Sequence, residues 1–75
     1  MKQYHIAEIQ NRPDGVINVQ NIETRTTLSS GLSYYYERCS KMAATTLYTS
    51  VTIIMFDSDG EIYENKHLKT AYEEE

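Results

Sequence analysis

A short acidic segment, Asp57-Ser58-Asp59-Gly60-Glu61, has the carboxylate spacing that begins a calcium-binding loop. The complete EF-hand pattern also needs a third oxygen ligand before the glycine, and a glutamate at the loop position where this chain has Leu68. The segments on both sides have the composition of strands, whereas an EF-hand loop joins two helices. We therefore expect an ordinary turn here, and we expect neither a metal nor a cofactor.

Two histidines and one cysteine are the other side chains with metal-binding or nucleophilic chemistry. His5 and His67 could hold a metal together with Glu64 if the first and last strands paired, but no short-range spacing supports such a site. We interpret both histidines as half-exposed strand residues. Cys39 cannot form an intrachain disulfide, and among apolar helix positions a free cysteine behaves as a small hydrophobic residue. Phosphate-binding and nucleophile-elbow motifs are missing, so we expect no enzymatic activity.

Tyrosine is the compositional anomaly of the chain, which holds seven, three of them consecutive at positions 34–36. Successive helix positions are about 100° apart, so these three rings cannot all be buried. We expect Tyr35 to join the core and Tyr36 to border it. Tyr34 should face outward, within reach of Arg38 for a cation–π contact. Because tyrosine is enriched at protein interfaces, Tyr34, Tyr36 and Arg38 are candidate partner-binding residues.

Charge is distributed unevenly along the chain, whose formal net charge is -4. Residues 1–56 hold five basic and four acidic side chains, whereas residues 57–75 hold two basic and seven acidic ones. Proteins that stack nucleic-acid bases on aromatic rings also need a positively charged groove, which the acidic part opposes. An acidic hairpin would instead attract a basic surface of another protein. Asp59, Glu61 and Tyr63 complete the candidate partner-binding residues.

The elements that must position these side chains begin with a β-hairpin. Residues 4–9 and 16–25 are rich in Ile, Val and Thr and flank the segment Asn11-Arg12-Pro13-Asp14-Gly15. Proline presets the backbone for a type I turn, and Gly15 accepts the left-handed conformation that follows it. In the second strand, Ile17 and Val19 share one face while Ile22 falls on the other. A bulge near Gln20-Asn21 would reconcile them.

An amphipathic helix follows the hairpin. Its apolar stripe recurs with helical spacing at Leu28, Leu32, Tyr35, Cys39 and Met42. Ser29 or Ser30 is the expected N-cap, and Thr45-Thr46 should end the helix. Glu37 and Lys41 are spaced for an ion pair on the solvent side.

A second hairpin completes the chain. Val51, Ile53 and Met55 share one face of residues 48–56, and Ile54 and Phe56 share the other, a pattern typical of a central strand. Residues 61–68 return as a more polar strand suited to a sheet edge. The acidic tail at 73–75 is expected to fray.

This order predicts an α+β fold in which a four-stranded, mainly antiparallel sheet of order ββαββ carries one helix on one face, as a single domain over residues 1–72. One helix covers only one face, so the other face stays open, and we expect function there. Apolar side chains left on the open face favour a homodimer. With no signal peptide and no membrane-spanning apolar run, the expected location is cytoplasmic.

The function that these observations favour is a non-enzymatic protein-binding module with an acidic, tyrosine-bearing surface. Small size, acidity, many tyrosines and no catalytic constellation are typical of accessory or inhibitory proteins of phages and mobile elements. Two alternatives stay open: a nucleic-acid-binding module that stacks bases on tyrosine, and a small homo-oligomeric structural protein.

Overall fold

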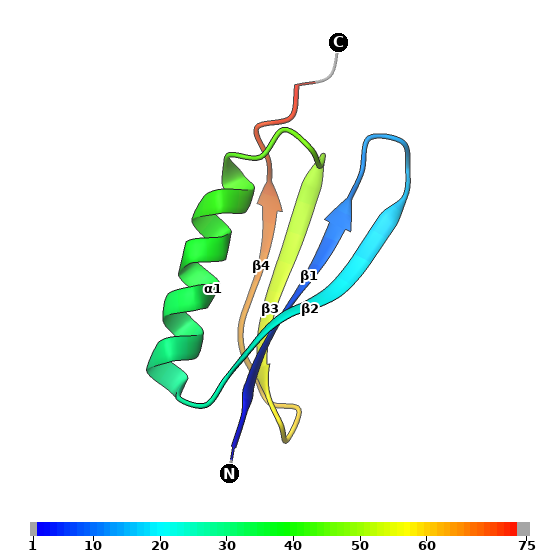
Figure 1. The fold of residues 1–75 in the computed structure, drawn as a ribbon. Coiled ribbons are helices and arrows are strands. Elements are labelled where there is room, and N and C mark those ends of the chain that lie inside the picture. The colour runs from blue at the N-terminus through cyan, green and yellow to red at the C-terminus, as the bar shows by residue number, and fades with distance from the viewer. Residues whose placement is uncertain (1, 74–75) are drawn as a thin grey trace.

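The computed structural model describes residues 2–73, which form one sheet and one helix (Figure 1). The elements along the chain are β1 (Tyr4–Asn11), β2 (Ile17–Arg25), α1 (Leu28–Ala43), β3 (Ser50–Asp57) and β4 (Ile62–Lys69). The strand order is β2-β1-β3-β4, and each neighbouring pair is antiparallel. The predicted α+β fold of order ββαββ is therefore confirmed. Within residues 2–73, no helix has the length and hydrophobicity that a transmembrane span requires.

The first hairpin turns as its sequence predicts. The Arg12 amide donates to the Val16 carbonyl at 2.9 Å, and the Gly15 amide donates to the Arg12 carbonyl at 3.0 Å. Gly15 has a φ of 88°, the left-handed conformation that a side chain disfavours. The Asp14 carboxylate accepts a hydrogen bond from the Val16 amide at 3.0 Å, which fixes the turn further.

The predicted bulge in β2 is also present. Ile6 of β1 pairs with Glu23, whereas the next residue, Ala7, pairs with Asn21. The extra residue is therefore Ile22, just beyond the predicted position. As a consequence, Ile22 packs against the core on the helix side of the sheet, although the apolar residues earlier in β2 point the other way.

Helix α1 begins at a different cap from the expected one. Thr27, in an extended conformation, is the N-cap, and its hydroxyl accepts a hydrogen bond from the Ser30 amide at 3.3 Å. The expectation of Ser29 or Ser30 was wrong because the helical conformation starts earlier, at Leu28. The helix ends before the two threonines, as predicted, and Lys41 lies 3.9 Å from Glu37 in the expected ion pair.

The core lies between α1 and the sheet. Its buried hydrophobic residues are Ile6, Tyr35, Val51, Ile53, Met55 and Leu68. Leu32, Cys39 and Met42 pack against this cluster as the helical stripe predicts, whereas Leu28 at the start of the helix is 40% exposed. Every second residue of β3 is buried, which confirms its central position. Glu73 is exposed beyond β4, and the predicted fraying of residues 74–75 falls outside the described residues.

Candidate functional site

The sheet has one face that α1 does not cover, which we call the open face. Strand alternation and the pairing registers give it sixteen side chains, four from each strand: His5, Ala7, Ile9 and Asn11; Ile17, Val19, Asn21 and Thr24; Ser50, Thr52, Ile54 and Phe56; and Ile62, Asn65, His67 and Lys69. The sequence predicts that such a face exists, and the structure shows which residues lie on it.

Charge is nearly absent from the open face. The chain holds seven basic and eleven acidic residues, yet Lys69, at the end of β4, is the one charged residue among the sixteen. The other charged residues of the strands point to the helix side or lie near the turns. Depletion of charge is the compositional mark of the centre of a protein interface, whereas an ordinary solvated face carries many charges.

Apolar side chains of the open face remain in contact with solvent. Ile17 is 60% exposed, Val19 is 71% exposed and Ile62 is 59% exposed. Ile54 and Phe56 in the middle of the sheet are half-buried, since the neighbouring strands flank them. The open face therefore carries apolar side chains from one edge strand to the other.

Both histidines lie on the open face and are tied to cross-strand threonines. His5 Nδ1 lies 3.0 Å from the Thr24 hydroxyl, and its ring is 5.4 Å from the Phe56 ring. His67 Nδ1 lies 2.7 Å from the Thr52 hydroxyl. The first and last strands are not neighbours, because β3 separates them. Within residues 2–73, no three potential metal-ligating side chains lie close enough together to hold one ion.

The predicted partner-binding residues of α1 lie on the helix side of the molecule. Tyr36 is 56% exposed, and its hydroxyl donates to the Glu64 carboxylate of β4 at 3.2 Å. This nearby carboxylate raises the pKa of Tyr36 above its ordinary value. Tyr34 is half-buried and packs against the core, so the expectation that it faces outward was wrong, and Tyr36 is the more exposed of the two. The Tyr34 ring lies 5.0 Å from the guanidinium of Arg25, so the expected cation–π contact with Arg38 was wrong in its partner.

Arg38 is instead engaged with Glu8, a residue that sequence reasoning missed. Arg38 donates to the two carboxylate oxygens of Glu8 at 2.6 and 2.9 Å, and the side-chain amide of Gln10 donates to the same carboxylate at 2.8 Å. The Glu8 side chain is completely buried beneath α1. Hydrogen bonding to this carboxylate raises the pKa of Arg38 despite partial burial. The alternation of Ile6, Glu8 and Gln10 in β1 is the sequence signal that could have placed Glu8 inward.

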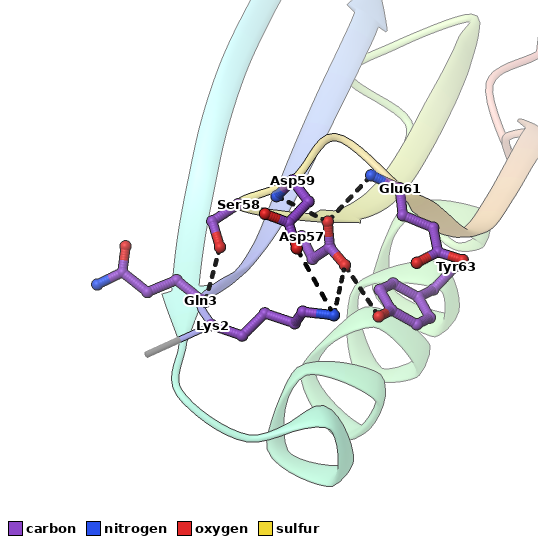
Figure 2. Close-up of polar contacts among 7 residues, drawn as sticks. All are labelled: Lys2, Gln3, Asp57, Ser58, Asp59, Glu61 and Tyr63. Carbon is purple, nitrogen blue, oxygen red and sulfur yellow. Dashed lines mark hydrogen bonds and ion pairs between the residues drawn. The ribbon is translucent and has the colours of Figure 1, made fainter.

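The acidic turn is a self-contained network around Asp57 (Figure 2). The buried Asp57 carboxylate accepts from the amides of Asp59 and Glu61 at 2.9 and 3.0 Å, and from the Tyr63 hydroxyl at 2.9 Å. Lys2 Nζ lies 3.4 Å from the same carboxylate. Burial acts to raise the pKa of Asp57, but these donors outweigh burial and lower it. The predicted turn is confirmed, and both carboxylate oxygens of Asp57 accept hydrogen bonds within it.

The six predicted partner-binding residues therefore lie in two places, and neither is the open face. Tyr34, Tyr36 and Arg38 lie on α1, whereas Asp59, Glu61 and Tyr63 lie at the turn between β3 and β4 and in the strand after it. The side chain of Asp59 is 75% exposed, while the hydroxyl of Tyr63 is used internally.

Two hollows lie beside the first hairpin rather than in the middle of the open face. One is lined by Arg12, Asn18, Leu47 and Tyr48, and the other by Pro13, Thr49, Lys69 and Tyr72. These linings contain no pairing of a nucleophile with a general base. Comparison with protein-family models, with curated proteins and with solved structures finds no match for this chain.

Proposed function

We propose that this chain is a non-enzymatic protein-binding module that engages its partner through the open face of the sheet. The observation that carries the proposal is the combination of charge depletion with uncovered apolar side chains on all four strands. Soluble monomers seldom expose a large contiguous apolar patch, and an uncharged apolar centre suits a flat protein surface. A module of this size would serve as an accessory or inhibitory protein, as in phages and mobile elements.

The partner that fits this surface is a protein with an apolar patch bordered by basic side chains. The chain has a net charge of -4, and Asp59 and Glu61 are exposed at one end of the sheet. Opposite charge around an apolar centre speeds association and fixes orientation. Nucleic acid fits this surface less well, because five of the seven lysine and arginine side chains already contact carboxylates: Lys2, Arg12, Arg25, Arg38 and Lys41.

The test compares two lysine substitutions at equally exposed apolar or aromatic positions. Ile62→Lys places a charge on the open face, and Tyr36→Lys places the same charge on the helix side, where exposure is 56% against 59% for Ile62. Each variant and the native protein are immobilised, exposed to lysate of the source cell treated with nuclease, and the bound proteins are quantified. We expect a protein retained by the native chain and by Tyr36→Lys at comparable levels, and at least tenfold less by Ile62→Lys.

Other outcomes of this capture are equally informative. Loss of the bound protein with Tyr36→Lys alone would move the binding surface to α1 and overturn the assignment to the open face. Equal retention by all three proteins would also overturn the assignment of binding to the open face. If binding disappears on nuclease treatment, the nucleic-acid-binding alternative replaces this proposal.

A further inference from the structure

Strand β2 forms one edge of the sheet, next to β1. In an edge strand, the amides and carbonyls of alternate residues point away from the neighbouring strand. The Arg12 amide bonds to the Val16 carbonyl, and the Asn11 carbonyl accepts from Thr49 on the β3 side. Hydrogen-bonded and non-bonded pairs alternate along an antiparallel ladder. The amides and carbonyls of Ile17, Val19 and Asn21 therefore face outward, as in any strand that can accept a further strand.

This edge lacks the features that usually prevent strands from pairing. Residues 16–22, with the sequence Val-Ile-Asn-Val-Gln-Asn-Ile, contain no charged residue, no proline and no glycine. The opposite edge, β4, carries charges at Glu64, Lys66 and Lys69. Charged side chains at edges discourage pairing between sheets, and an uncharged segment of high β-propensity favours it. The two edges of the sheet thus differ in charge, and of the two, β2 is the edge suited to accept a further strand.

We propose that two copies of this chain pair through their β2 edges, antiparallel, about a two-fold axis at Val19. In this register Val19 pairs with the partner subunit's Val19, and Ile17 pairs with the partner subunit's Asn21. The contact ends before the bulge at Ile22, where added twist disrupts a regular ladder. The two four-stranded sheets become one continuous sheet, and their open faces become one surface.

The lack of charge along β2 favours a second copy as the occupant of this edge. A two-fold contact places identical surfaces together, so any net charge in it repels itself. Each copy carries a net charge of -4, and the uncharged stretch of β2 is where two such chains can approach with least repulsion. The acidic turn between β3 and β4 lies at the opposite end of the sheet from the tip of the first hairpin (Figure 1). Val19, 71% exposed in the single chain, would lose water against its symmetry mate.

This inference goes beyond the proposed function and does not rest on it, because a heterologous partner would contact side chains across the open face, whereas a second copy would pair with the backbone of the β2 edge. Sedimentation equilibrium separates the possibilities. For the native chain we expect a mass near twice 8.7 kDa at micromolar concentration. Val19→Lys brings two like charges together at the axis and should raise the dissociation constant at least tenfold. Ile62→Lys, equally drastic but on β4, should leave the dimer intact.

Hydrogen exchange gives a readout at the backbone that does not depend on a variant. The amides of Ile17, Val19 and Asn21 should exchange more slowly as protein concentration rises, while the outward amides of β4 should not respond. A native chain that stays monomeric to millimolar concentration would overturn the proposal. A dimer that survives Val19→Lys but dissociates with Ile62→Lys would also overturn it, and would assign the contact to packing of the open faces.

Discussion

Two carboxylates are buried on the helix side of the sheet, and the side chains that contact them explain why the fold tolerates this burial. Glu8 and Asp57 are both fully buried at the side chain, and each accepts hydrogen bonds and lies in an ion pair with a basic side chain. A buried charge that loses its partner leaves a desolvated ion, which costs more than the pair gains. Removing the partner should therefore be more damaging than removing both members.

Glu8 and Arg38 test this difference directly. Arg38→Met should destabilise the fold by about 3 kcal/mol, at the lower end of the range for buried pairs because the Arg38 side chain keeps 20% of its exposure. Glu8→Leu combined with Arg38→Met should recover most of the loss. Urea denaturation of the three proteins measures both effects. A double variant no more stable than Arg38→Met would contradict the assignment of the cost to the unpaired carboxylate.

Asp57 should make stability depend on acid pH. Its pKa is lowered on folding, so the ionised carboxylate stabilises the fold fully above the ordinary aspartate pKa, and this contribution is lost as pH falls through the lower, folded value. Asp57→Asn should lower the melting temperature by several degrees at neutral pH and should flatten its decline below about pH 4. Asp59→Asn, at a side chain that is 75% exposed, is the matched control and should change neither.

Residue-level contacts were the part of the molecule least accessible from sequence. Helix phase alone places Tyr34 and Arg38 one turn apart. The cation that contacts the Tyr34 ring is instead Arg25, the last residue of β2. Arg38 turns instead toward Glu8, thirty positions away in the sequence. Both contacts depend on how β1 and β2 sit beneath the helix, and no local pattern encodes that arrangement.

At the scale of elements, local chemistry predicted most of the structure. The turn around Pro13 and Gly15, the stripe of α1 and the two-sided apolar pattern of β3 each depend on neighbouring residues, and each is confirmed. Strand order depends on the non-local pairing of β1 with β3, so the sequence left it open. An open face could be predicted, because the central strand is apolar on both faces and the chain offers one helix to cover them. The sixteen residues on that face could not be predicted, because they depend on the register of the strands.

The first turn offers a test at this scale. Gly15 has a φ of 88°, and space around it is open, so an added methyl group meets strain but no clash. Gly15→Ala should cost about 1 kcal/mol, and Gly15→Asn should cost less because asparagine tolerates the left-handed conformation. Thermal unfolding of both variants measures the difference. Equal stability of Gly15→Ala and the native protein would contradict the strain argument.

The whole molecule is thin for its length. The Cα trace extends 48 × 20 × 14 Å along its principal axes, the dimensions of one helix on one sheet. Such a two-layer arrangement has a single small core, and domains of this size are only marginally stable alone. Association through the β2 edge and coverage of the open face would each add buried apolar surface, so both proposed contacts would also raise the stability of the fold.

Ionic strength should affect the two proposed contacts in opposite directions. Two copies with a net charge of -4 repel each other, and salt screens that repulsion, because the Debye length falls from about 30 Å at 0.01 M to about 3 Å at 1 M. The native dimer should therefore tighten as sodium chloride is raised, whereas binding to a partner with a basic border should weaken. Sedimentation equilibrium and partner retention across the same salt series measure the two trends.

Combining Asp59→Asn with Glu61→Gln removes two exposed charges and should reduce both slopes, which separates screening from a general effect of salt on apolar contacts. A dimer that weakens with salt would show that its contact contains opposite charges, which the uncharged β2 edge does not provide.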